Sequence, residues 1–215
     1  MEKPGKAEID KVINDWNKHF PALKRYGSGR KLLKLYGPLI YGIELEAFLS
    51  DVYRPRVVLF TLLDDRTAFA FAIDQLIKDK KGLDLDVTYK LHDVQFIDAV
   101  NTLIKQSIIP LEENINPEHA IKYIFKFLNI RPMGSNPFAS CHTIMLLSKY
   151  IDNQDMADNY FNVAVKLIKE ESSDHFIKSN FENFDLWVEQ QKKLTLTDLN
   201  ERVKANIIKA KLNRW

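Results

Sequence analysis

Two pairs of acidic residues have the spacing of a metal or acid–base site. Glu44 and Glu46 stand two positions apart, and Asp84 and Asp86 repeat that spacing. Residues two apart share one face of a β-strand, and Lys90 falls on the same face as the two aspartates. Because converging carboxylates bind divalent cations and transfer protons, these five residues define one hypothesis, a metal-dependent hydrolase or nuclease. The solvent-facing side of an amphipathic strand gives the same pattern, so the alternative is ordinary surface.

Cys141 and His142 combine a candidate nucleophile with a candidate base. They are adjacent, and neighbouring side chains in a helix point about 100° apart, so within a helix they cannot form a dyad. A thiolate near the start of a helix is stabilised, which leaves a reactive Cys141 open. The alternative is a small buried side chain in a helix–helix contact.

Metal and phosphate sites are not predicted. The other histidines are His19, His92, His119 and His175. None has the short spacing that puts two metal ligands on one helical face, so we expect no metal site. The chain has 7 glycines without a phosphate-binding pattern, and the glycine-containing stretch 27–31 lacks a preceding buried strand. We therefore expect no cofactor, and no small-molecule substrate is evident.

A cluster of tyrosines and arginines is the candidate contact surface. It comprises Tyr36, Tyr41, Tyr53, Arg54 and Arg56. Both residue types dominate protein interaction hot spots, so the cluster predicts binding to a protein partner. The alternative is a hairpin that packs its tyrosines over the sheet.

The charge balance argues against phosphate-rich partners. Lys and Arg number 31 against 29 Asp and Glu, so the net charge is +2 and the molecule projects no strong field. Nucleic acid is therefore not the expected partner. The basic segment 18–34 keeps nucleic-acid binding as a third hypothesis, for which affinity must fall as salt rises.

Composition also predicts the compartment. With 46% hydrophobic and 28% charged residues, the chain resembles an ordinary globular protein. Its one cysteine cannot form an internal disulfide, which fits a reducing compartment. The first residues lack the apolar stretch of a secretory signal, and no run approaches the roughly 20 apolar residues of a membrane span. We expect a soluble, cytoplasmic protein with no membrane partner.

The first half of the chain predicts one helix and a small sheet. Apolar residues recur at three- and four-residue steps over 6–20, as in an amphipathic helix. Segments 39–45 and 57–63 have the composition of buried strands and can form an antiparallel pair. Alternation over 83–91 predicts a third, half-buried strand, whereas 67–81 is compatible with a short helix.

The second half predicts consecutive helices. They are a helix over 93–109, one capped by Asn116 that runs through Leu128, and others over 139–150, 154–170, 176 or 181 to 192, and 198–212, the last capped by Thr197. A loop is expected over 131–137 because proline, glycine and asparagine gather there.

This organisation predicts an α+β fold, mostly helical, with a small antiparallel sheet from the first half packed against a helical second half. We expect a single domain over 1–215, with a helix and sheet portion over 1–92 and a helical portion over 93–215. The leading hypothesis is a non-catalytic intracellular protein-binding domain, such as a bacterial regulatory or toxin-neutralising (immunity-type) partner. The hydrolase or nuclease is the alternative.

Overall fold

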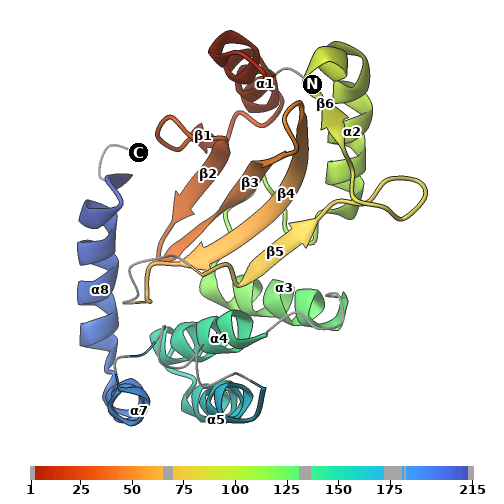
Figure 1. Cartoon of the computed structure of the whole chain (residues 1–215). Helices are drawn as coiled ribbons and strands as arrows, with labels where there is room; N and C mark the ends of the chain where they lie inside the picture. Colours follow the sequence, from red (N-terminus) through yellow and green to blue (C-terminus); the bar gives the residue numbers. More distant parts are fainter. Residues whose placement is uncertain (1–2, 65–69, 131–136, 172–180, 182, 213–215) are drawn as a thin grey trace. The chain divides into compact units, whose positions relative to one another are not determined.

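The protein has the α+β fold that the sequence predicts, with helices and an antiparallel sheet from the first half of the chain (Figure 1). A computed structural model describes residues 3–64, 70–130, 137–171, 181 and 183–212. The chain divides into two compact units, Met1–Leu59 with Ile73–Ile115, and Phe60–Ala72 with Asn116–Trp215. A single domain divided at residue 92 stays a prediction.

The first unit contains the sheet and two helices. Its elements are α1 (Lys6–His19), β1 (Lys24–Arg25), β2 (Lys31–Tyr36), β3 (Leu39–Phe48), β4 (Val52–Thr61, whose last two residues belong to the second unit), β5 (Ile73–Leu76), β6 (Val87–Thr88), a 3-10 helix (Tyr89–Leu91) and α2 (His92–Gln106). The strand order is β1-β2-β3-β4-β5, and β6 also pairs with β4. The two strands predicted over 39–45 and 57–63 are therefore the neighbouring strands β3 and β4.

Close packing of β2 against β3 explains one glycine. Gly42 lies opposite Leu33, and a Cβ atom on Gly42 would come within 2.1 Å of the carbonyl oxygen of Leu32. Any side chain at this position would force the two strands apart, because backbone cannot move aside as a flexible side chain can. Only glycine permits this register.

The predicted third strand over 83–91 is wrong for most of its length. Only Val87–Thr88 pair with β4, and Tyr89–Leu91 form a 3-10 helix. The alternating pattern arises partly in a loop where Leu83 is exposed and the Asp79 carboxylate accepts a hydrogen bond from the Leu83 backbone N–H. A helix over 67–81 is also wrong where it is described, because Ile73–Leu76 form β5; residues 65–69 lie outside the described residues.

The described helices of the second unit match the predicted series. They are α3 (Pro117–Ile130), α4 (Phe138–Tyr150), α5 (Gln154–Glu171), α7 (Phe184–Lys193) and α8 (Leu196–Lys209). The Asn116 side chain accepts a hydrogen bond from the His119 N–H at 2.8 Å, which confirms the predicted cap. The cap of α8 is Thr195 and not Thr197, because Thr195 and Asp198 form a capping box. The predicted loop over 131–137 lies almost wholly outside the described residues.

Candidate functional site

The carboxylates of the hydrolase hypothesis are each paired with a cation. On β3, Glu44 lies 3.3 Å from the ammonium of Lys31, and Glu46 lies 2.9 Å from the guanidinium of Arg56. Arg56 also pairs with Asp74 of β5. Opposite charges thus alternate across the strands, so these side chains already neutralise one another.

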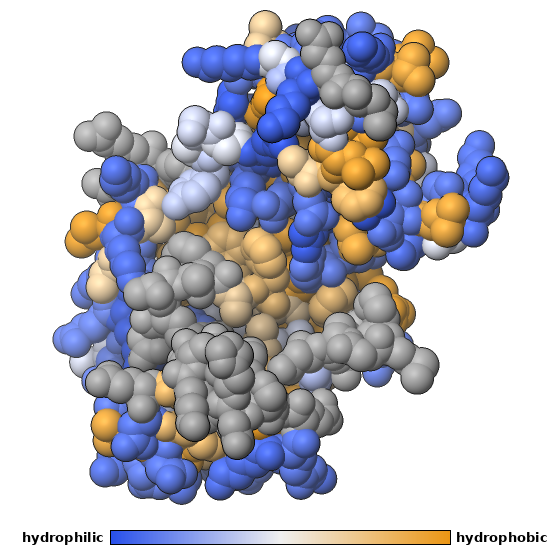
Figure 2. Space-filling model, viewed as in Figure 1, coloured by the Kyte–Doolittle hydropathy of each residue, from blue (hydrophilic) through white to orange (hydrophobic). Residues whose placement is uncertain are grey.

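The second pair of acids follows the same rule. Arg54 of β4 lies 2.5 Å from Asp86 and 3.2 Å from Asp84, and Lys78 lies 2.6 Å from Asp84. Arg54 also stacks over the Phe48 ring at 3.2 Å from its centroid. Figure 2, viewed as Figure 1, shows mainly hydrophilic side chains over α1, at the top of the view. Ion pairs within the first unit account for both pairs of acids. Because these carboxylates do not converge on one site, the hydrolase stays a hypothesis.

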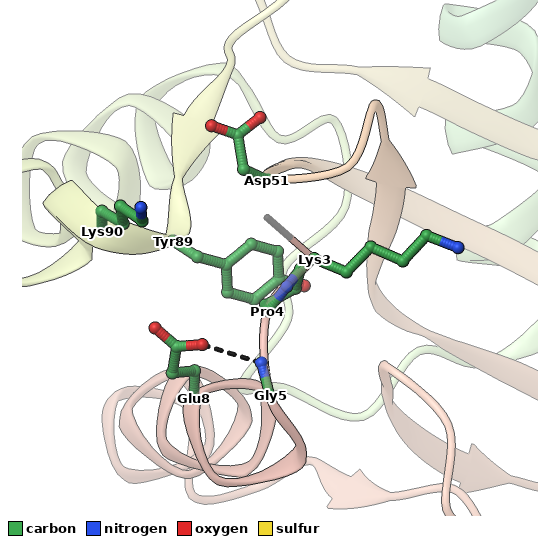
Figure 3. A pocket seen from close by; sticks show the side chains of 7 residues that line it. All are labelled: Lys3, Pro4, Gly5, Glu8, Asp51, Tyr89 and Lys90. Carbon is green, nitrogen blue, oxygen red and sulfur yellow. Dashed lines mark hydrogen bonds between the residues drawn. The ribbon is translucent and has the colours of Figure 1, made fainter. Parts of the chain in front are cut away.

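Lys90, the fifth residue of that hypothesis, lines a pocket of about 290 Å³ in the first unit (Figure 3). The pocket is formed by the start of the chain, by Asp51, and by Tyr89 and Lys90, and neither predicted aspartate lines it. The Glu8 carboxylate, also in the lining, accepts a hydrogen bond from the Gly5 N–H at 2.7 Å and helps to cap α1. Ammonium groups and carboxylates both line the pocket, so its charge favours neither an anionic nor a cationic ligand.

The tyrosine and arginine cluster divides between core and surface. Tyr41 and Tyr53 are fully buried, whereas Tyr36 is 42% exposed. The Tyr41 hydroxyl donates to the Glu113 carbonyl at 2.7 Å, and burial raises its pKa. Tyr41 and Tyr53 therefore pack on the sheet and offer no contact surface, while Arg54 and Arg56 remain partly exposed within their ion pairs.

A buried polar network, not foreseen in the sequence, joins α1, β4 and α2. Trp16 Nε1 donates to the Tyr53 hydroxyl at 3.2 Å, and that hydroxyl lies 2.9 Å from His92 Nδ1. His92 Nε2 lies 3.4 Å from the Asp15 carboxylate. The Tyr53 proton has Nδ1 as its acceptor, so the neutral ring carries its own proton on Nε2 and donates it to Asp15. The network is consistent from end to end.

Lys11 forms ion pairs with the carboxylates at the outer end of this network. Its ammonium lies 3.0 Å from Asp15 and also pairs with Asp93 at the start of α2. The hydrogen bonds that Lys11 donates to Asp93 and Asp15 raise its pKa. Burial lowers the pKa of His92, with Lys11 acting in the same direction, so the imidazole stays neutral at pH 7. Burial also raises the pKa of Tyr53 well above its ordinary value, which keeps its hydroxyl protonated.

Asp15, His92 and Asp93 form the one set of three metal-ligating groups found within the described part of the chain. One ligand atom from each lies within 4.8 Å of the other two. Sequence reasoning missed this set because 77 positions separate Asp15 from His92. The signal that the sequence offered was His92 next to Asp93 at the start of a helix, because both side chains of a first turn can reach a neighbouring element.

A row of exposed apolar side chains runs along α2. Val94 is 80% exposed, Ile97 53% and Ile104 54%, and Leu91 immediately before the helix is also exposed. Val100 and Leu103 of the same helix are buried. The helix therefore has two apolar faces, one in the core and one open to solvent.

The sulfur candidate, Cys141, lies in α4 of the second unit. Cys141 and His142 are both buried in α4, on different sides of the helix. His142 Nδ1 lies 3.6 Å from Asp64, and its Nε2 lies 3.4 Å from the Gln191 side chain. The Phe138 ring stacks on the imidazole, so His142 is a core residue.

The remaining predicted groups have structural surroundings. His19 packs its ring against Phe96, and His119 lies in the capped first turn of α3, while His175 lies outside the described residues. In the basic segment 18–34, Arg25 pairs with Asp10 at 2.8 Å, and Lys34 donates to the Glu112 carbonyl. Part of that segment's charge is thus neutralised within the first unit.

Comparisons with known proteins give no assignment. No protein family, no curated protein and no solved structure matches the chain. Among the described residues, no helix combines the length and apolar character needed to cross a bilayer.

Proposed function

We propose that this chain is a non-catalytic, cytoplasmic protein-binding domain that docks an amphipathic helix of its partner on the exposed row of α2. The single observation that supports it is the exposure of Val94, Ile97 and Ile104 along α2, together with Leu91 just before the helix. Exposed apolar side chains are common singly, whereas three along one helix, with a fourth just before it, are typical of an interaction site.

The shape of the row favours a helix as the occupant. From Val94 to Ile104 the row is about 15 Å long, at a rise of about 1.5 Å per residue. A ridge of this form packs against the grooves of another helix. A partner helix with apolar residues at three- and four-residue steps would cover it.

Charges beside the row define the partner further. Asp98 and Lys105 are exposed, lie seven residues apart on the same edge of the row, and have no ion-pair partner among the described residues. A complementary helix would present a basic group opposite Asp98 and an acidic group opposite Lys105. Such pairs mainly set orientation and specificity.

The expected affinity is modest. Burying the half-exposed row contributes about 1 kcal/mol per side chain, or about 4 kcal/mol in total, before the entropic cost of association. The row alone therefore supports a transient complex, which suits a regulatory partner. A toxin-neutralising role needs further contacts beyond α2.

Affinity capture from the native host tests the proposal. The baits are the wild-type chain, the double variant Ile97→Gln with Ile104→Gln, and the control Ile208→Gln, which changes a still more exposed isoleucine on α8. We expect one stoichiometric partner with wild type and control, and its loss with the α2 variant. Capture of the same partner by the wild-type chain and the α2 variant would contradict the proposal. Recovery of no stoichiometric partner from the host, together with turnover of a small substrate, would contradict it as well.

A further inference from the structure

We propose that Asp15, His92 and Asp93 form a site for a divalent transition-metal ion of the zinc type, which binds by displacing the ammonium of Lys11. The site is independent of the docking row. It would tie the C-terminal half of α1 to the first turn of α2.

Ligand geometry is the first argument. Zinc holds nitrogen and oxygen ligands at about 2.0–2.2 Å in a tetrahedron, so two of its ligand atoms are about 3.4 Å apart. His92 Nε2 and Asp15 Oδ2 are 3.4 Å apart, and the Asp93 oxygen completes a triangle with all sides within 4.8 Å. Asp93 is exposed in the first turn of α2, so its side chain can rotate to close the remaining distance. Water can occupy the fourth position.

The second argument is that the Lys11 ammonium, a cation, already occupies the site. The Lys11 ammonium already contacts both Asp15 and Asp93, which shows that a cation fits between them. The lysine side chain is 52% exposed and has a flexible stem, so it can withdraw to solvent. A doubly charged ion gains about twice the Coulomb attraction of one ammonium at the same separation.

The third argument is the fixed orientation of the His92 imidazole, which also decides where the ring proton lies when a metal ion binds. His92 is 3% exposed, and Tyr53 fixes its ring through Nδ1, as an outer partner orients a metal-ligating histidine. Metal binding needs Nε2 without its proton. The neutral ring therefore carries its proton on Nδ1 instead and donates it to the Tyr53 oxygen, while the hydroxyl proton of Tyr53 rotates away from Nδ1; no net proton leaves the ring. One nitrogen and two carboxylates favour zinc-type ions over magnesium or calcium, which prefer oxygen ligands alone.

Titration of the tag-free full chain with Co²⁺ tests the site, because tetrahedral Co²⁺ with such ligands absorbs visible light. We expect a new visible absorption band, displaced by Zn²⁺ and not by Mg²⁺. Asp93→Asn should weaken Co²⁺ binding about tenfold or more, since even outer partners of a metal ligand contribute that much. Lys11→Ala should strengthen binding several-fold because it removes the competing cation.

Asp98→Asn, an exposed acid on the same helix and outside the triangle, is the matched control and should bind Co²⁺ as wild type does. Both Asp93→Asn and Asp98→Asn change exposed side chains, so both variants should fold, which far-UV circular dichroism checks. Absence of the absorption band in both wild type and Lys11→Ala would overturn the proposal. Equal Co²⁺ binding by wild type and Asp93→Asn would overturn it as well.

Discussion

The hydroxyl of Tyr53 on β4 lies 2.9 Å from Nδ1 of His92 on α2, and both side chains are buried. The same hydroxyl accepts a hydrogen bond from Trp16 of α1. One oxygen atom therefore links three elements that are distant in sequence. Because the groups around it are largely withdrawn from water, each depends on this oxygen for its hydrogen bond.

Removing that oxygen should destabilise the fold. Tyr53→Phe leaves a buried acceptor on His92 and a buried donor on Trp16 without a partner, so the free energy of unfolding should fall by about 1–3 kcal/mol. Urea denaturation measures the change. Tyr36→Phe, which alters an exposed tyrosine of β2, is the control and should stay within about 0.5 kcal/mol of wild type. Equal stability of Tyr53→Phe and wild type would show that water replaces the hydroxyl.

Truncating two neighbouring residues of α2 should change the free energy of unfolding by very different amounts. Leu103→Ala removes a fully buried side chain and should lower the free energy of unfolding by about 2–5 kcal/mol. Ile104→Ala removes a 54% exposed side chain and should change it by less than about 0.5 kcal/mol. Denaturant unfolding of both variants tests this. A large loss with Ile104→Ala would mean that the row is covered within the folded chain and is not a docking face.

Glycine 42 gives a prediction about strand register. Gly42→Ala would put a methyl group within 2.1 Å of the Leu32 carbonyl oxygen, and backbone is the group that must move. We expect a loss of about 3 kcal/mol or more in thermal or urea unfolding. Gly29→Ala is the control, because its added methyl would lie 3.4 Å from the nearest atom. Near-wild-type stability of Gly42→Ala would show that β2 and β3 can separate at little cost.

Local patterns predicted the elements well and the site poorly. The helix over 6–20 was predictable because Val12, Ile13 and Trp16 fall on one buried face. Periodicity alone could not show that α2 has a second apolar face in solvent, because an apolar residue has the same sequence pattern whether covered or exposed. The acidic spacing at Glu44 and Glu46 was real, but its cause, Lys31 and Arg56 on neighbouring strands, depends on register.

The polar network shows the same limit more sharply. Asp15, Tyr53 and His92 come from α1, β4 and α2, and no spacing rule connects residues so far apart in sequence. Tyr53 was assigned to a contact surface by residue type alone, whereas burial gives it a structural role. Residue type indicates what chemistry is available, and only the packing of the elements decides which groups meet.

The capping box of α8 gives a prediction with a defined pH range. Hydrogen bonds from the Thr195 hydroxyl and backbone N–H lower the pKa of Asp198 below its ordinary value of 3.8. The ionised carboxylate is therefore favoured in the folded state, so its stabilising contribution is complete above about pH 4 and is lost as pH falls through the folded pKa. Asp198→Asn removes this contribution at every pH. The difference in unfolding free energy between wild type and Asp198→Asn should be largest near pH 7 and shrink towards pH 2, which denaturant unfolding across that range measures. A difference that stays constant from pH 7 to pH 2 would mean that the carboxylate charge does not stabilise the cap.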